Sequence, residues 1–569
     1  MSWNGAGAWA QTTMDEMNSP VHNQPVELSN GSIFQLEAKP IAKSIDGKMV
    51  HMYSYNGQIP GPMLKVKQGS SVYVNFTNNI DMDTAVHWHG LRLENKYDGV
   101  PGVTQTAVKP GESFLYKLDF PDEGIYWYHP HLREDKQQEM GLYGSIFVEP
   151  KDKNYFNPVD DEIFLFLDDI RMVNDDLDKF GKDGAEFALM GRFGNVMLVN
   201  GETNYQVTVR GETARFYLTD SSNTRTFNFS IGDHKMKLVG GDSGKYERES
   251  LVDSITISPG ERYIVEVMFS EPGEYKLLHK TPTKTYELGT VKVTGSAPTP
   301  QEFSDFFTPL KENTDIISSI DPFRKHFDAK PDYELDLTVK MLSDEDSGME
   351  GMDMNGMNME ETTGENAAKP IEPIEWEEGE GKQMNSESTS ENTKWIIMDK
   401  LTGKESPNYK VKVGDVKKIR IFNDPSSAHP MQHPIHLHGA RFLVLNVDGT
   451  PNDNLVWKDV VLVPTGSTVD ILVQFTEPGE WVAHCHIAEH LEAGMMFSFT
   501  VNPSSLISPD TTLLSPLKQF KSGVAADDVV CKEGLQLLVK NVGGSPACVK
   551  PTSVSRLIAQ GWAMGMKLH

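Results

Sequence analysis

The sequence predicts an all-β protein of three β-sandwich domains, followed by a small C-terminal tail that contains a disulfide. One 21-residue strand–turn–strand pattern occurs three times without a gap, starting at Gly111, Gly260 and Gly466. A strand–glycine turn–strand pattern lies upstream of each copy, starting at Lys65, Gln206 and Lys410. Alternating β-branched and aromatic residues between glycine turns are typical of short sandwich strands. The copies lie too far apart for a solenoid, so each is expected to form a domain with its own core.

The domain boundaries follow from these copies. The chain has 569 residues, and length alone predicts about three or four domains. We place the domains at residues 25–152, 153–298 and 331–502, with a Pro- and Asp-containing linker at 299–330 and the tail at 503–569.

The third domain carries an acidic, methionine-rich insertion at residues 343–392. This segment holds 15 Asp and Glu against two Lys and has few residues that could form a core. Such a composition predicts a mobile, solvated loop.

Cysteine usage bears on location. Cys531 and Cys548 flank a segment that is typical of a glycine-turn hairpin, and we expect them to form a disulfide rather than remain free thiols. A disulfide favours an extracytoplasmic setting, whether periplasmic, cell-surface or secreted. The first twenty residues have neither a basic nor an apolar signal region, so no signal peptide is expected. The sequence contains no run of 18 apolar residues, so no transmembrane segment is expected.

The formal net charge of −28 makes nucleic acid and anionic membranes poor partners and cations good ones. We expect a monomer.

The histidines are clustered. Ten of the 17 fall in four short windows, at 87–90, 129–131, 433–439 and 484–495. One histidine in a β-protein is usually a satisfied or solvated side chain. The repeated H-x-H spacing indicates metal ligands instead, because residues i and i+2 of a strand project from the same face.

Strand alternation divides the window from His484 to Met495 between two sites. His484 and His486 point to one face, whereas Cys485 points to the other. Two histidines, a cysteine and a weak axial methionine form the ligand set of blue copper sites. Cys485, His490 and Met495 supply three of these ligands, and His433 is the candidate for the fourth. Zinc is the alternative metal for Cys and His ligands, but it needs neither the methionine nor eight further histidines.

Alignment of the three copies shows which domains bind metal. Where the third copy has His484, Cys485 and His486, the first has His129, Pro130 and His131. The second copy has Leu278, His279 and Lys280, and it has no H-x-H pair upstream. We therefore interpret the middle domain as a spacer or wall. The first and third domains would share eight imidazoles, which suit a cluster of about three copper ions.

All four histidine windows resemble those of three-domain multicopper oxidases of the laccase and cuprous-oxidase type, and the resemblance covers residues 40–502. It implies cupredoxin-like domains and four copper ions. The implied type 1 ligands are His433, Cys485, His490 and Met495. The implied type 2 ligands are His87 and His436. The implied ligands of the type 3 pair are His89, His129, His131, His438, His484 and His486.

The resemblance also implies a reaction. A reducing substrate is oxidised by one electron at type 1 copper, electrons pass through Cys485 to His484 and His486, and four electrons reduce O₂ to water. Asp98 and Glu489 are candidates to deliver protons. For both carboxylates, a structural or turn role is the alternative interpretation.

The electron donor is the open question. Met349, Met352, Met354, Met357 and Met359 of the insertion are soft thioethers, which select Cu(I). The resemblance to cuprous oxidases favours a metallo-oxidase that serves copper tolerance, although this loop has no histidine. His429 and Met431 are candidates to line the access to the type 1 site, and a surface role is the alternative. The alternatives are a laccase that oxidises phenols or other small donors, a copper nitrite reductase, and a copper-binding protein without catalysis.

Overall fold

The computed structural model describes residues 25–295, 301–342, 372–379, 381–503 and most of 515–563. The chain divides into two compact units, which we call the main unit, up to Asn502, and the C-terminal unit, from Pro503 onward. The five methionines of the insertion that we singled out lie outside the described residues.

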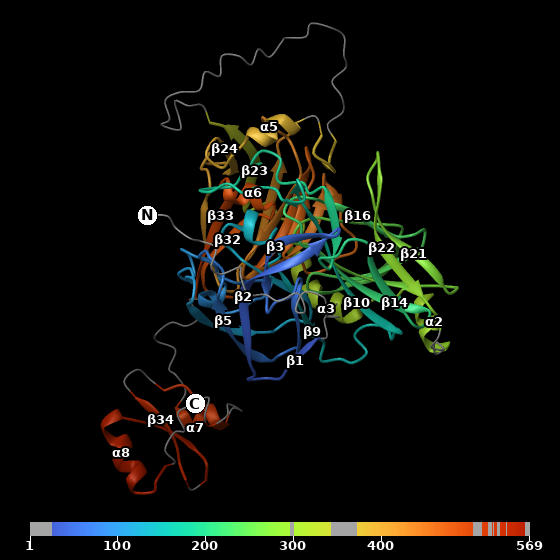
Figure 1. Cartoon of the computed structure of the whole chain (residues 1–569). Helices are drawn as coiled ribbons and strands as arrows, with labels where there is room; N and C mark the ends of the chain where they lie inside the picture. Colours follow the sequence, from blue (N-terminus) through green and yellow to red (C-terminus); the bar gives the residue numbers. More distant parts are fainter. Residues whose placement is uncertain are drawn as a thin grey trace. The chain divides into compact units, whose positions relative to one another are not determined.

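The first stretch of the main unit forms two facing β-sheets (Figure 1). The order of one sheet is β1 (Val26–Leu28), β4 (Gly61–Lys67), β9 (Gly144–Glu149), β8 (Gly124–His129) and β6 (His87–His89). The order of the other is β3 (Lys48–Tyr55), β2 (Ile33–Ile45), β5 (Ser71–Asn78) and β7 (Ser113–Asp119). Short helices η1 (Asn95–Tyr97) and α1 (Glu134–Gln137) lie in the connections.

The middle stretch repeats this arrangement. One sheet has the order β13 (Val196–Val199), β10 (Asp161–Ile170), β15 (Thr213–Asp220), β20 (Arg262–Met268), β17 (Met236–Gly241) and β18 (Gly244–Val252). The other has the order β14 (Tyr205–Val209), β22 (Thr285–Val293), β21 (Gly273–Lys280), β16 (Phe227–Ile231) and β19 (Ile255–Ile257). A small ribbon pairs β11 (Met172–Val173) with β12 (Asp176–Leu177).

The third stretch completes the main unit. One sheet has the order β24 (Thr393–Asp399), β23 (Tyr333–Met341), β26 (Val416–Asn423), β31 (Thr468–Phe475), β28 (Ala440–Val447) and β29 (Thr450–Pro451). The other has the order β25 (Asn408–Lys412), β33 (Met496–Asn502), β32 (Gly479–Cys485), β27 (His433–Leu437) and β30 (Val460–Val463). Helix α6 (Ala488–Glu492) follows β32.

Each repeated strand–turn–strand segment crosses from one sheet of its sandwich to the other. In the third stretch β31 and β32 belong to different sheets, as do β7 and β8 in the first and β20 and β21 in the second. The predicted all-β sandwich fold is confirmed. The crossing explains why the two strands of a segment need not pair with each other: the turn carries the chain over the core.

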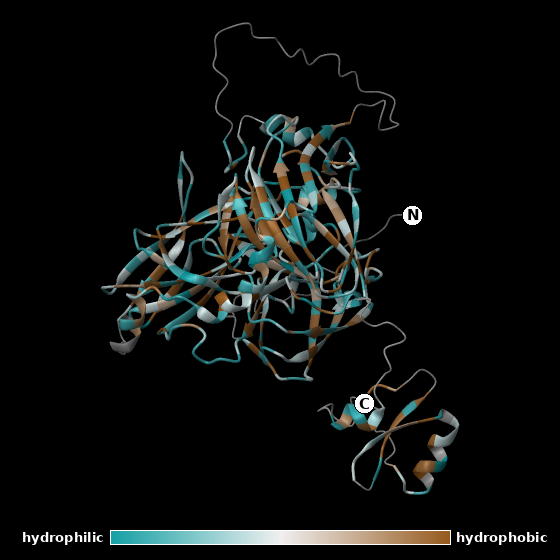
Figure 2. Ribbon diagram, turned by 180° about the vertical axis from the view of Figure 1, so that it is seen from behind, coloured by the Kyte–Doolittle hydropathy of each residue, from teal (hydrophilic) through white to brown (hydrophobic). Residues whose placement is uncertain are grey.

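Apolar residues are concentrated on the strands of the sheets (Figure 2), and many of their side chains are buried. Alternation is clear in β5, where every second residue is buried, as expected for a strand with one face toward the core. Each stretch has its own cluster of buried side chains, and Ala188, Leu189, Met190 and Phe193 of the middle stretch join the cluster of the third. The boundaries at 152, 298 and 331 stay a prediction.

The connector before the third stretch is helical, which the sequence analysis did not predict. It contains α2 (Gln301–Phe307), α3 (Thr314–Ile320) and η2 (Asp321–His326). Ile316 and Ile320 of α3 are buried in a cluster with Leu443 and Trp457. The connector is therefore held against the third stretch by apolar contacts.

The described part of the acidic insertion, residues 372–379 and 381–392, differs from the expected solvated loop. It includes α5 (Lys382–Glu387), in which Asn385 is fully buried. Glu378 pairs with Arg171 at 2.9 Å, and Arg225 donates to the Trp376 carbonyl at 2.7 Å. Two arginines of the middle stretch thus bind this segment, and composition alone could not reveal those partners.

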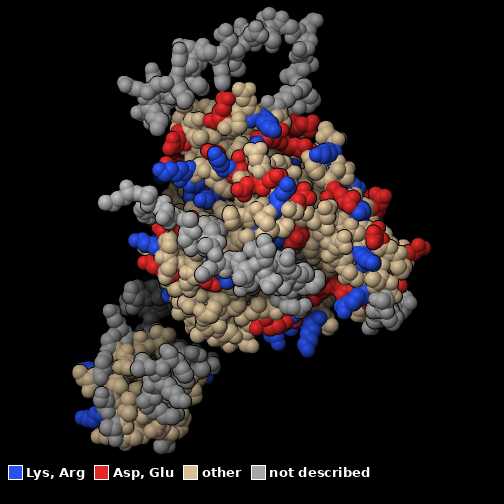
Figure 3. Space-filling view, in the orientation of Figure 1, with Lys and Arg blue, Asp and Glu red and all other residues tan. Residues whose placement is uncertain are grey.

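Charges of both signs are interspersed on the face of the main unit that Figure 3 displays. None of the helices in the described part of the chain is both long and apolar enough to cross a membrane.

The C-terminal unit contains α7 (Pro516–Lys521), β34 (Gln536–Val539), β35 (Pro546–Val549) and α8 (Pro551–Ala559). Strands β34 and β35 form an antiparallel hairpin. Cys531 and Cys548 form a disulfide, so that prediction is confirmed.

Candidate metal centre

Two pairs of neighbouring strands bring the four histidine windows together. In the first stretch β6 lies beside β8, so His87 is opposite His129. In the third stretch β27 lies beside β32, so His436 is opposite His484. The H-x-H windows therefore meet because their strands are neighbours in the sheets, although the two strand pairs are more than 300 residues apart in the chain.

One set of donor atoms gathers around Cys485 and is called the Cys485 site below. The Cys485 Sγ lies 3.6 Å from His433 Nδ1 and 3.8 Å from His490 Nδ1, and these two nitrogens are 3.3 Å apart. All three residues are buried. Met495 is also buried, and it belongs to the same apolar cluster as Cys485.

An aromatic wall holds the imidazoles of the Cys485 site. The Trp395 ring stacks on His490 with centroids 4.2 Å apart and meets His433 edge-on at 4.7 Å. The Trp395 Nε1 donates to the Ala188 carbonyl at 2.8 Å, which fixes the indole. No sequence motif singled out this tryptophan.

The other predicted ligands form the eight-histidine site. Within each of three triplets, one donor atom per residue lies within 4.8 Å of the others. The triplets are His87, His89 and His436; His89, His129 and His486; and His131, His438 and His484. The first two triplets share His89, and His87 stacks on His438 of the third with ring centroids 3.9 Å apart, so the eight histidines form one buried cluster from the first and third stretches.

Most of these rings use one nitrogen for a hydrogen bond to an oxygen and leave the other for the cluster. The Nδ1 atoms of His87 and His436 donate to the backbone carbonyls of Asp98 and Asp459, at 2.7 and 2.8 Å. Because a carbonyl only accepts, these bonds fix the tautomer and leave each Nε2 unprotonated. Neither Nε2 has a hydrogen-bond partner among the described residues.

Facing lone pairs show that the donor set fits a cation. His438 donates through Nδ1 to Asp98 Oδ2 at 2.9 Å, and His484 donates through Nδ1 to the Cys485 carbonyl at 2.9 Å. The two remaining Nε2 atoms nonetheless lie 3.0 Å apart. Two unprotonated nitrogens repel at this distance unless a cation lies between them, and buried neutral imidazoles are ligands that copper prefers.

Burial also sets the protonation of the site. Desolvation lowers the pKa of His484 to about 4 and that of His433 to about 3, and it holds the pKa of His438 well below its usual range. These rings are neutral near pH 7 and free to bind metal. Desolvation raises the pKa of the Cys485 thiol, so a bound cation is needed to deprotonate it at neutral pH.

Asp98 lies on the outer side of the eight-histidine site. Besides accepting from His438, its Oδ1 lies 3.4 Å from His87 Nδ1. The carboxylate is buried. It contacts the nitrogens that face away from the cluster, so it orients two rings rather than competing with them for metal.

Glu489 is held by a loop of the middle stretch. Its two oxygens accept from Asn223 Nδ2 and Thr224 Oγ1, each at 3.0 Å. Burial, together with the nearby Asp135, raises the pKa of Glu489 to about 8. The carboxyl therefore carries a proton at neutral pH inside a closed site.

The middle stretch, interpreted from the sequence as a spacer or wall, also contributes hydrogen bonds to residues beside the candidate ligands. Asn223 and Thr224 reach Glu489, and Arg262 at the start of β20 binds Asp459 at 2.6 Å. One signal in the sequence was available: Arg262 occupies the repeat position that holds Ser113 and Thr468 in the other copies. An arginine on a strand where the other copies have a hydroxyl residue indicates a specific hydrogen-bond or ion-pair partner.

His429 and Met431 differ in their surroundings. Met431 is fully buried, so it does not line an open surface. His429 is partly exposed, and its Nε2 lies 3.1 Å from Glu375 of the insertion. The Gln432 side chain binds the same segment twice. Its oxygen accepts from the Glu375 N–H at 2.7 Å, and its amide nitrogen donates to the Glu375 carbonyl at 3.1 Å.

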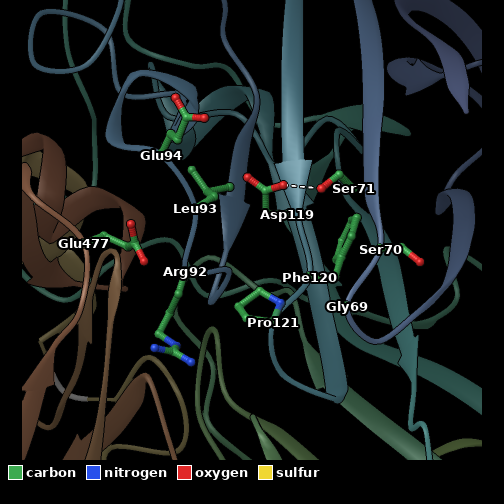
Figure 4. Close-up of a pocket in the computed structure, with 10 residues that line it drawn as sticks. All are labelled: Gly69, Ser70, Ser71, Arg92, Leu93, Glu94, Asp119, Phe120, Pro121 and Glu477. Carbon is green, nitrogen blue, oxygen red and sulfur yellow. Dashed lines mark hydrogen bonds between the residues drawn. The ribbon is translucent and has the colours of Figure 1, made fainter. Parts of the chain in front are cut away.

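A surface pocket elsewhere in the main unit is separate from both sites. Among its described lining residues are Ser71, Arg92, Asp119 and Glu477, and none is a candidate ligand (Figure 4). Ser71 and Asp119 are hydrogen-bonded to each other.

Three family models match the chain, each described as multicopper oxidase, at residues 37–153, 171–295 and 377–505. Together they cover more than half of the sequence. The chain is 27% identical over 450 residues to multicopper oxidase mco of Staphylococcus epidermidis, covering 78% of this chain and 82% of that protein. It is 28% identical over 496 residues to Laccase-1 of Botryotinia fuckeliana, covering 82% and 81%.

A solved structure has the same fold. A multicopper oxidase from Campylobacter jejuni, described as a metallo-oxidase, aligns with a TM-score of 0.61 and 23% identity, over 85% of this chain and 93% of that one. The clustered histidine windows, the three sandwiches and the family models agree: this chain belongs to the multicopper oxidase family and is an oxidoreductase.

Proposed function

We propose that the protein holds four copper ions and couples one-electron oxidation of Cu(I) to the four-electron reduction of O₂ to water. The type 1 ligands would be His433, Cys485, His490 and Met495. The type 2 ligands would be His87 and His436. The type 3 ligands would be His89, His129, His131, His438, His484 and His486. Copper at these sites supplies the one-electron steps and the reduction of O₂.

The observation that carries this proposal is the position of Cys485. Its thiol belongs to one donor set, whereas its chain neighbours His484 and His486 belong to the other. Its carbonyl also accepts from His484 Nδ1 at 2.9 Å. A covalent and hydrogen-bonded connection of a few atoms therefore joins the two sites, as electron transfer between them requires.

The residues around the sites exclude water and orient the rings. Every histidine of both sites is less than a tenth exposed. Buried imidazoles with one nitrogen fixed by an oxygen acceptor keep their tautomer and direction, which tunes a bound metal.

Reduction of O₂ also consumes protons, and two carboxyls support their delivery. Glu489, protonated at neutral pH, would release its proton from an oxygen that Asn223 or Thr224 contacts. Asp98 would take up a proton at Oδ1, which has no hydrogen-bond partner among the described residues, and release it toward the cluster. General acid–base groups of this kind contribute roughly 10²–10⁴-fold to a rate.

Cu(I) is the favoured donor because of what surrounds the Cys485 site. His433 is only 1% exposed, which leaves little room for a phenol ring to contact it. Glu375 and His429 offer a carboxylate and an imidazole at the partly exposed side. The acidic segment with its five methionines precedes Glu375 in the chain, and thioethers select Cu(I).

Oxygen uptake with Cu(I), Fe(II) and a phenol tests the donor. The variant is a deletion of residues 343–371, which spares the bound segment from residue 372 onward. A matched variant replaces Met349, Met352, Met354, Met357 and Met359 by leucine and keeps length and charge. We expect both changes to lower kcat/KM for Cu(I) and to spare the phenol. A phenol that is the far better donor, with Cu(I) turnover unchanged in both variants, would show a laccase instead.

The disulfide between Cys531 and Cys548 supports an extracytoplasmic location. We also propose that the protein acts as a monomer, which sedimentation of the full chain would test.

A further inference from the structure

Two aspartates hold the eight-histidine site in the same manner. Asp98 accepts from His87 through its carbonyl and from His438 through its carboxylate. Asp459 accepts from His436 through its carbonyl, at 2.8 Å, and from His89 Nε2 through its carboxylate, at 3.0 Å. Each aspartate thus binds the first histidine of the H-x-H pair in its own stretch and the second histidine of the pair in the other stretch.

The rings that each aspartate joins lie face to face. His87 and His438 stack with centroids 3.9 Å apart, and His89 and His436 stack at 3.7 Å. Each aspartate therefore fixes one stacked pair that crosses between the first and third stretches.

The two aspartates differ in their cation partner. Asp459 binds Arg262, which donates Nη2 to Oδ2 at 2.6 Å and Nη1 to Oδ1. Both side chains are fully buried. No lysine or arginine in the described part of the chain pairs with Asp98. A two-pronged Arg–carboxylate pair fixes direction as well as charge.

Arg262 connects all three stretches. It comes from β20 of the middle stretch, its Nε donates to the Ile125 carbonyl of the first at 3.0 Å, and its fork binds Asp459 of the third. Asp242, also of the middle stretch, accepts from the backbone N–H groups of Arg262 and Asp459, at 2.9 and 3.1 Å. Both ends of the pair are therefore anchored to backbone.

Gly90, which follows His89, confirms how closely the pair is enclosed. Its φ is +83°, and a Cβ added there would lie 2.5 Å from Asp459 Oδ2 and 2.8 Å from Arg262 Nη2. Only glycine fits both this backbone conformation and this approach.

The consequence falls on His89. Its Nε2 is bound by Asp459, so it presents Nδ1 to the cluster, 3.4 Å from His129 Nε2. His87 and His436, by contrast, bind their acceptors through Nδ1. A rotated His89 would turn the wrong nitrogen toward the cluster, and the position of the Asp459 carboxylate prevents this rotation.

We propose that Asp459 and Arg262 are positioning residues for the trinuclear copper ligands, and that Arg262 makes the middle domain a working part of that site. Arg262 holds the Asp459 carboxylate, and Asp459 holds His89 and His436. The inference rests on the proposed copper assignment.

Copper content and spectra of the full chain test the proposal, using Arg262→Gln, Asp459→Ala and Asp459→Asn. We expect Arg262→Gln and Asp459→Ala to lose at least half of the trinuclear copper while the type 1 absorption keeps its intensity. Asp459→Asn keeps an oxygen acceptor for His89, so it should retain more copper than Asp459→Ala. All three variants should also show an altered electron paramagnetic resonance signal from the type 2 copper that they retain.

The matched control is Arg215→Gln. Arg215 is a buried arginine of the same sheet, paired with Glu266 at 2.8 Å away from both sites. It should keep the full copper load. Equal copper loss in Arg215→Gln and Arg262→Gln would overturn the proposal, because the effect would then be general loosening. A full load and an unaltered type 2 signal in Arg262→Gln would overturn it as well.

Two further readouts keep the test decisive. If Asp459→Ala does not fold, Arg262→Gln and Asp459→Asn carry the comparison, since both retain side-chain volume. A wild-type chain without any type 2 signal would refute the copper assignment itself, whereas a normal wild type with normal variants refutes only the positioning role.

Discussion

The two candidate copper sites lie back to back on β32, yet they are built differently. The Cys485 site takes all its candidate ligands from residues 433–495 of one sandwich. The eight-histidine site takes its ligands from two sandwiches, and the third contributes Arg262. The comparison teaches that a site within one sandwich depends on strand geometry, whereas a site between sandwiches depends on how they pack.

Replacing Cys485 should remove copper from the Cys485 site and leave the eight-histidine site intact. In Cys485→Ser, we expect loss of the visible type 1 band and turnover at the background rate, because a serine hydroxyl is a poor ligand for copper. The copper of the eight-histidine site should remain. Metal analysis and absorption spectra check this, and a variant that keeps its colour would show that the assigned ligand set is wrong.

Glu489→Gln tests the eight-histidine site, the other member of the comparison. The amide keeps the contacts with Asn223 and Thr224 but carries no transferable proton. We expect kcat to fall by about 10²-fold, with both copper spectra unchanged. Glu480→Gln, a change at an exposed carboxylate on β32, the strand that precedes α6, is the control. Normal turnover in Glu489→Gln would leave this residue a purely structural role.

Copper removal should weaken the main unit, because it leaves unprotonated nitrogens facing each other at 3.0 Å. A ligand at a thousandfold excess over its Kd stabilises the native state by about 4 kcal/mol. We expect a lower thermal midpoint for the chelated protein. We also expect faster hydrogen exchange at β6 and β27, where the sandwiches meet. Equal exchange with and without copper would contradict a site that joins them.

The smallest effect is expected outside the Cys485 site. Glu375→Gln removes the charge beside His429, so KM for Cu(I) should rise a few-fold while kcat and the type 1 band stay constant. Glu387→Gln, an exposed change in the same segment, serves as the control. A lower kcat with an unchanged KM would place Glu375 in electron transfer instead of donor binding.

The fold and the ligand candidates could be read from local patterns. The three copies predict the sandwiches, and H-x-H spacing predicts the shared face of each histidine pair. The bound segment from residue 372 onward could not be read, because its acidic composition conceals its pairing with Arg171 and Arg225. Trp395 was missed as well, since its alternation pattern is that of any core strand.

The sequence by itself determined that Cys485 faces away from His484 and His486, because side chains alternate along every strand. It also determined which two copies keep the imidazoles. Only the tertiary structure decided how those imidazoles are held. The nitrogen that His89 turns inward depends on Asp459, and Asp459 depends on Arg262 of a different sandwich. No pattern along one strand encodes that contact, because it arises where three sandwiches pack together.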